Sequence, residues 1–65
     1  MKVHEVIKYY GTKRKVADVL GVRYQAVQNW EVAGFVPEGR QWQIQALTAG
    51  ILTVDKHFLK RAATA

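Results

Sequence analysis

The sequence contains no cysteine, which excludes disulfide bonds and thiolate metal sites. It also lacks any apolar run near the ~20 residues of a membrane span, and no secretion signal is apparent at its start. We therefore expect a soluble, full-length chain in the cytoplasm, a single domain over residues 1–65. Helix packing, alone or with a partner subunit, must hold so small a fold together.

Acidic residues are few. The chain has 5 Asp and Glu against 10 Lys and Arg, which gives a net charge of +5 and a pI near 9.9. A domain of this size with this charge is typical of proteins that bind a polyanion. The alternative is a basic surface that serves only solubility.

Apolar spacing, glycines and capping residues divide the chain into five predicted helices. Apolar residues recur at helical spacing, and Trp42, Ala46 and Ala49 line one side of the fourth helix. Glycines end the first, second and fourth helices, and Thr12 is placed to cap the second. The predicted helices span 2–10, 12–20, 23 or 24 to about 32, 38–49, and the residues that follow Asp55. Segment 51–54 is undecided between a short strand and the lead-in to the last helix. The predicted fold is thus all-α, a compact five-helix single domain.

The second and third predicted helices are separated by only Gly21 and one or two further residues. Helices joined so tightly cross steeply, as in a helix-turn-helix. Ala17 is small where the helices approach, and Val27 and Trp30 supply the buried face of the second element. The pattern therefore predicts a helix-turn-helix formed by helices two and three.

The stretch GVRYQAVQNW, residues 21–30, carries two kinds of side chain on opposite sides of a helix. At about 100° per residue, Ala26, Val27 and Trp30 face the core, and polar groups cover the other arc. In a helix-turn-helix this helix enters the major groove, where amides can bond adenine and arginine can bond guanine. The residues predicted to read bases are Arg23, Tyr24, Gln25, Gln28 and Asn29. The alternative is a solvated polar face that reads nothing.

Three cations at the start of the second helix oppose the positive end of its macrodipole. Their placement is favourable when an anion lies there, as it does when this helix end abuts the DNA backbone. The predicted phosphate contacts are Lys13, Arg14 and Lys15 and, on the other flank, Arg40 and Gln41. Lys56, Lys60 and Arg61 are interpreted as ordinary surface charge.

The segment GTKRKVADVLGVRYQAVQNWEVAGFVP, followed by GRQWQIQALTAG, resembles the Cro repressors of lambda-like temperate phages, and among them the all-helical branch. The resemblance covers residues 3–52 and is most specific in the helix-turn-helix. It implies a transcriptional repressor of the lytic–lysogenic decision that binds operator DNA as a dimer in a bacterial host. By position it implies the same five base-reading residues and adds Thr12, with Lys13, near phosphate. One departure is that Arg23 and Tyr24 replace the usual cap residues of the recognition helix.

One chain supplies one recognition helix, whereas two half-sites about 34 Å apart require two. Several apolar residues lie in predicted loops or near the C-terminus, where they predict a homodimer interface or, equally well, core burial. These residues are Phe35, Val36, Ile51, Leu52 and Phe58. The dimer either forms in solution or is weak and assembles on the operator.

The same sequence is compatible with other classes of function. His4 with Glu5 and His57 with Asp55 lie at opposite ends of the chain without a third partner, so we expect no enzyme, cofactor, metal or small-molecule ligand. An excisionase-like architectural protein would share the W-x-x-x-G-x-x-P pattern but needs a β-hairpin wing where 40–49 predicts helix. An antitoxin-like helical regulator would dock through Phe35, Trp42 and Phe58, and the net charge argues against that as its sole function.

Overall fold

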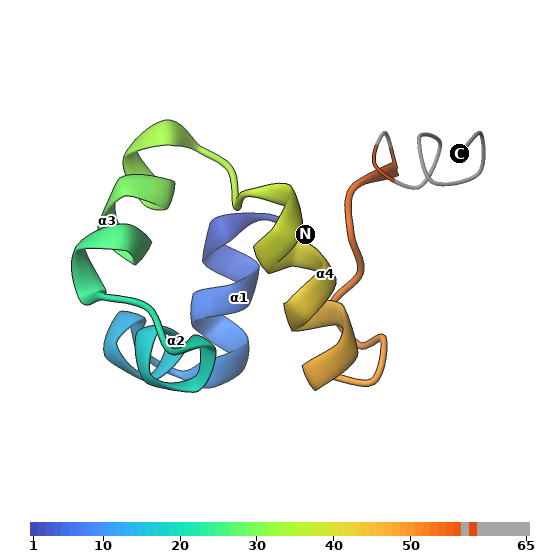
Figure 1. Cartoon of the computed structure of the whole chain (residues 1–65), viewed down its shortest axis with the longest axis horizontal. Coiled ribbons are helices and arrows are strands. Elements are labelled where there is room, and N and C mark those ends of the chain that lie inside the picture. The colour runs from blue at the N-terminus through green and yellow to red at the C-terminus, as the bar shows by residue number, and fades with distance from the viewer. Residues whose placement is uncertain (57, 59–65) are drawn as a thin grey trace.

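The computed structural model describes residues 1–56 and Phe58. These residues form four helices: α1 (Val3–Tyr10), α2 (Lys13–Leu20), α3 (Tyr24–Ala33) and α4 (Glu38–Leu47). In Figure 1, α2 and α3 occupy one end of the molecule, α4 the other, and α1 lies between them. No helix in this part of the chain is long and apolar enough to cross a membrane.

Local sequence sets the boundaries of α2. Thr12 precedes the helix, and its Oγ1 accepts a hydrogen bond from the Lys15 backbone N–H at 3.1 Å, as expected of an N-cap residue. Gly21 ends the helix at φ +70°, a left-handed conformation that costs glycine little and other residues more. Both boundary residues were predicted in these roles, and both predictions are confirmed.

The core is an apolar cluster to which every helix contributes. Its central members, including Val16, Val27 and Ile44, have no measurable exposure, so the three helices that carry them meet around one centre. The complete cluster is Val3, Val6, Val16, Ala17, Leu20, Val27, Trp30, Val36 and Ile44. The buried face predicted for α3 is therefore confirmed.

Helix α4 differs from its prediction in length and in its buried face. It ends at Leu47, two residues early, because Ala49 and Gly50 turn left-handed at φ +53° and +84°. The predicted apolar line through Trp42, Ala46 and Ala49 does not face the core. Gln41 and Ile44 are buried instead. The apolar pattern misplaced this face because a polar residue, Gln41, is buried on it.

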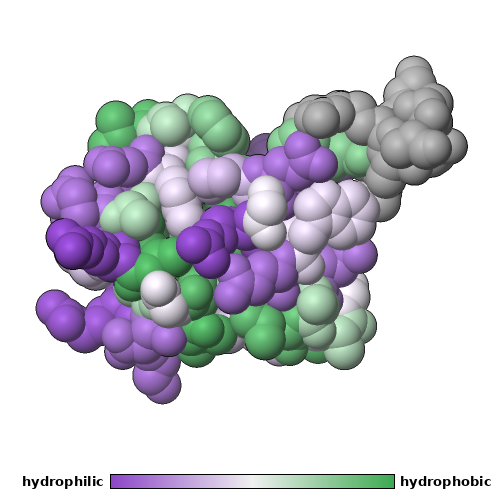
Figure 2. All heavy atoms as spheres, viewed as in Figure 1, coloured by the Kyte–Doolittle hydropathy of each residue, from purple (hydrophilic) through white to green (hydrophobic). Residues whose placement is uncertain are grey.

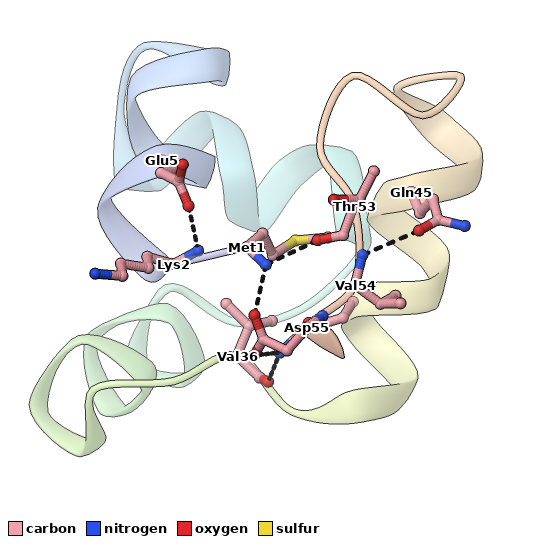
Figure 3. Close-up of polar contacts among 9 residues, drawn as sticks. Met1, Lys2, Glu5, Val36, Gln45, Thr53, Val54 and Asp55 are labelled. Atoms are coloured by element: carbon pink, nitrogen blue, oxygen red, sulfur yellow. Dashed lines mark hydrogen bonds and ion pairs between the residues drawn. The ribbon is translucent and has the colours of Figure 1, made fainter. Parts of the chain in front are cut away.

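Of the two structures considered for residues 51–54, the strand is wrong: the segment leads into Lys56 and Phe58, which are helical, and Phe58 N donates to Asp55 O at 3.0 Å. Residues 51–55 contain no strand and no helix in the described structure. Polar contacts hold the segment: the Met1 ammonium donates to Thr53 O and Asp55 Oδ1, both at 2.7 Å, and Val54 N donates to Gln45 Oε1 at 3.0 Å (Figure 3). Within the described residues four helices can be bounded at both ends, where five were predicted. Of the expected fifth, Asp55, Lys56 and Phe58 are described, and the rest lies outside the described residues.

Candidate nucleic-acid interface

Helices α2 and α3 are joined by three residues, Gly21, Val22 and Arg23. The turn is fixed by two backbone hydrogen bonds, from Gly21 N to Asp18 O at 3.3 Å and from Val22 N to Ala17 O at 3.0 Å. Ala17 is 3% exposed, and its small side chain allows the helices to pack closely at this point. This is the short connection and close packing predicted for a helix-turn-helix.

The outward face of α3 carries the residues predicted to read bases. Arg23, Tyr24, Gln25 and Asn29 are exposed and Gln28 is half-buried, whereas Val27 and Trp30 on the other side are buried. Figure 2 shows hydrophilic side chains projecting from the α2–α3 end of the molecule. Tyr24, Gln25, Gln28 and Asn29 thus lie on one accessible side of α3, and Arg23 is exposed at its start.

The start of α3 is open. Arg23 occupies the N-cap position with φ −75° and ψ 148°, and within the described part of the chain no side chain caps this helix. The first backbone N–H groups of a helix have no partner in the helix itself. The helix therefore starts without a side-chain cap and beside a cationic side chain, as its unusual first residues predicted, although Ala26 N in its first turn donates to Arg23 O at 2.9 Å.

Two of the amide side chains on this face are paired with each other. Gln25 Nε2 donates to Asn29 Oδ1 at 3.1 Å, across one helical turn. This hydrogen bond uses neither the acceptor Gln25 Oε1 nor the donor Asn29 Nδ2. Gln25 and Asn29 therefore form one composite donor–acceptor unit, whereas the sequence suggested two independent readers.

Val32 belongs to the same face and was missed in the sequence analysis. It is 89% exposed, and at about 100° per residue it lies between the directions of Gln25 and Gln28. The signal was present, because Val32 follows Gln28 by four residues and Asn29 by three. The predicted base-reading residues all carry polar groups, whereas an apolar side chain can also recognise the thymine methyl.

The N-terminal end of α2 forms a shallow basic hollow against α3. Its lining consists of Ile7, Thr12, Lys13, Arg14 and Tyr24. The Arg14 guanidinium lies 5.7 Å from the centre of the Tyr24 ring, within the range of a cation–π contact. Three of the residues predicted near phosphate are therefore adjacent to the start of α3, and Lys15 is exposed on the same turn of α2.

Lys13 is engaged with α3. Its Nζ lies 2.7 Å from Glu31 Oε1 and 3.5 Å from Gln28 Oε1. The hydrogen bond to the Glu31 carboxylate stabilises the ammonium and raises the pKa of Lys13 above its ordinary value. Lys13 is thus a cation held against α3, and its partner Glu31 was not among the residues singled out from the sequence.

The two residues predicted to contact phosphate on the other flank, Arg40 and Gln41, differ in accessibility. Arg40 is partly exposed and donates to Gln43 Oε1 at 2.8 Å, so it remains a candidate. Gln41 is 0% exposed and donates to Val36 O at 2.8 Å. The prediction that Gln41 contacts phosphate is therefore wrong, because the side chain is enclosed in the protein and its donor is used there.

The residues predicted to form a dimer interface also differ in accessibility. Val36 is 0% exposed and belongs to the core cluster, so its assignment to an interface is wrong. Leu52 is half-buried against the same cluster, and Phe58 is half-buried. Phe35 and Ile51 are 56% and 69% exposed. These two are the surface apolar groups that a partner copy would reach.

The described residues contain no group of three or more His, Cys, Asp or Glu side chains suited to a metal ion. Glu5, considered with His4, accepts a hydrogen bond from Lys2 N at 2.6 Å and so serves the start of α1. His57, considered with Asp55, lies outside the described residues.

Comparison with known proteins places this surface in context. A model of the family described as DNA-binding transcriptional regulator Cro matches residues 2–63. The regulatory protein Cro of Salmonella phage P22 is 34% identical over 59 residues, which cover 91% of this chain and 93% of that protein. The repressor protein of the division inhibition gene dicB from Escherichia coli K12 is 33% identical over 51 residues, 78% of this chain and 66% of its own length. The structure of N15 Cro complexed with consensus operator DNA matches with a TM-score of 0.80 and 34% identity over the whole of both chains.

Proposed function

The chain belongs to the family of DNA-binding transcriptional regulators called Cro, and on that premise we propose that it binds a two-fold symmetric operator as a dimer, with α3 of each copy in the major groove. Bound there, it represses transcription in the lytic–lysogenic decision of a phage. Its place of action is the nucleoid of the bacterial host.

The observation that carries this proposal is the outward polar face of α3, flanked by the basic end of α2. A recognition helix needs accessible donors and acceptors near its N-terminus, and phosphate-binding groups beside it. Both are present within a single surface. The likeness to N15 Cro, whose structure was solved with consensus operator DNA, supports the same orientation on DNA.

The roles of individual residues follow from their chemistry and position. Arg23, Tyr24, Gln25, Gln28 and Asn29 meet base edges, and Val32 packs on a thymine methyl if the groove is followed to the end of α3. Thr12, Lys13, Arg14 and Lys15 hold one stretch of backbone, and Arg40 the other. Thr12 keeps its hydroxyl proton for a phosphate oxygen, because in its cap hydrogen bond the hydroxyl is the acceptor.

Dimerisation rests on the two-fold symmetry of such operators and on the exposed apolar side chains of Phe35 and Ile51. Two recognition helices spaced by about one DNA turn require two copies of this chain. Whether the copies meet in solution or on the operator is decided by comparing the oligomeric state with and without DNA.

The test of the proposal is selection from a random duplex DNA pool at about 150 mM salt, followed by sequencing of the bound fraction. We expect enrichment of a two-fold symmetric site with half-sites about one helical turn apart. Retention of DNA with no enriched sequence would mean that the protein binds DNA only through sequence-independent electrostatic attraction to the phosphates. That result would overturn the operator-binding proposal in favour of an architectural DNA binder.

A further inference from the structure

Lys13 bridges the two helices of the DNA-binding unit through a carboxylate. Its Nζ lies 2.7 Å from Glu31 Oε1 and 3.5 Å from Gln28 Oε1, so α3 supplies two acceptors to a cation that begins α2. Glu31 is the sole acidic residue of α3, and α2 has no acidic residue in its first turn. The basic end of the interface therefore contains one negative group, and it is bonded to Lys13.

Solvent reaches this pair from outside. The side chains of Lys13 and Glu31 are 29% and 47% exposed. An incoming phosphate can therefore approach the same ammonium, and a carboxylate and a phosphate present it with similar anionic oxygens. Lysine carries a compact charge on a flexible stem, so its Nζ can exchange one anion for another without movement of the helices.

We propose that Glu31 is an internal competitor of the DNA backbone for Lys13, a positioning residue that holds the ammonium over the recognition helix and so weakens binding to every DNA sequence. The inference rests on the proposed role of Lys13 as a phosphate contact. When Lys13 turns to a phosphate, the Glu31 carboxylate loses its cation and is left beside a polyanion. That cost is the same for operator and for random DNA, because the phosphate backbone carries no sequence information.

The competition has a consequence for salt dependence. Each phosphate neutralised by a protein cation steepens the plot of log K against log salt concentration by about 0.9. A Lys13 shared between Glu31 and phosphate contributes only part of that amount. The wild-type slope should then lie between that of a protein whose Lys13 is fully available and that of a protein without Lys13.

The experiment compares Glu31→Gln with the wild type on the selected operator and on random duplex DNA, from about 50 to 300 mM salt. Glutamine keeps the shape of the side chain and removes its charge. We expect binding to both DNAs to tighten by about two- to fivefold, the range in which exposed ion pairs act. The slopes of Glu31→Gln and Lys13→Ala should differ by about 0.9, with the wild type between them.

The matched control is Asp18→Asn, which removes one negative charge from an exposed site at the other end of α2. It measures the effect of net charge alone, so Glu31→Gln must exceed it. The decisive comparison is made in a Lys13→Ala background, where Glu31→Gln should do no more than Asp18→Asn. Thermal melting of each variant confirms that affinity changes occur in folded protein.

Two outcomes overturn the inference, and they are distinguishable. If Lys13→Ala weakens binding but Glu31→Gln matches Asp18→Asn, Lys13 contacts DNA without competition from Glu31 and the proposed function stands. If Lys13→Ala changes neither affinity nor salt slope, the phosphate contact assigned to Lys13 in the proposed function fails as well.

Discussion

Gln41 and Asp55 exchange hydrogen bonds although 14 residues separate them in the sequence: Gln41 Nε2 donates to Asp55 Oδ2 at 3.0 Å, and Asp55 N donates to Gln41 Oε1 at 2.9 Å. The same amide nitrogen donates to Val36 O at 2.8 Å. One buried side chain of α4 thereby ties together the loop that precedes α4 and the segment that follows it. The Met1 ammonium completes the arrangement at Asp55 Oδ1, 2.7 Å away (Figure 3).

We therefore expect Gln41→Leu to lower the free energy of unfolding by about 2–3 kcal/mol, since a buried donor or acceptor left unsatisfied costs about 1–3 kcal/mol. Leucine keeps most of the volume, so the loss reports the polar contacts. Urea denaturation measures it. The control is Gln43→Leu on the same helix, where the partly exposed side chain accepts from Arg40, and a loss below about 1 kcal/mol is expected. Equal losses in the two variants would contradict a structural role specific to Gln41.

A second stability prediction concerns Ala49, which has φ +53° just beyond the end of α4. This left-handed conformation costs an L-residue roughly 1–2 kcal/mol, and glycine adopts it freely. Ala49→Gly should raise the free energy of unfolding by about 0.5–1 kcal/mol, the strain being partly offset by the greater freedom of glycine in the unfolded chain.

The control for Ala49 is Ala46→Gly, an exposed position within α4. There the same change should destabilise by about 1 kcal/mol, because glycine is a poor helix former. Thermal melts of both variants decide the matter. A loss of stability in Ala49→Gly would mean that the left-handed turn is not strained.

The sequence predicted those parts of the fold that depend on local rules. Three features were found as expected: the Thr12 cap, the glycine that ends α2, and the apolar stripe through Val27 and Trp30. Each depends only on residues that lie close together in the sequence. Four of the residues assigned to base reading, Tyr24, Gln25, Gln28 and Asn29, lie on one accessible face for the same reason.

The features that sequence reasoning missed depend on partners distant in the chain. Gln41 was assigned to a phosphate contact from its place in the first turn of the fourth helix, and its partner Asp55 is found only in the folded chain. Glu31 drew no attention because its lysine lies on another helix, 18 residues away. Local periodicity cannot reveal such pairs, since nothing in the spacing of either helix records them.

Arg23 offers a test of the balance between stability and binding. It stands at the N-cap of α3 with no capping hydrogen bond within the described chain. Arg23→Ser should stabilise the protein by about 0.5–1 kcal/mol by supplying the missing cap. It should also weaken DNA binding, since a cation at the groove is lost. Melting temperature and affinity for the selected operator are measured together, and a variant that loses both would show that Arg23 has a structural role as well.

Gln28 and Lys13 should separate base reading from backbone contact. Gln28→Ala should relax base preference at one operator position by about 1–3 kcal/mol, and Lys13→Ala should weaken operator and random DNA alike and make the salt slope shallower by up to about one. Binding is compared on the operator, on single-base variants and on random duplexes. Identical behaviour of the two variants on all of these DNAs would refute the division of roles.

The exposed apolar residues give the last prediction, which concerns assembly. Ile51 is a large apolar side chain that is 69% exposed, and it is proposed to contact the partner copy. Ile51→Ser should weaken binding to the full operator by about tenfold, the effect of losing one buried interface anchor, and leave binding to a single half-site unchanged. Val19→Ser, a change at a 46% exposed apolar residue of α2, serves as the control and should alter neither.

Sedimentation with and without DNA then shows whether the lost contact belonged to a dimer present in solution or to one assembled on the operator. Equal weakening on half-site and full site would place Ile51 outside the dimer contact.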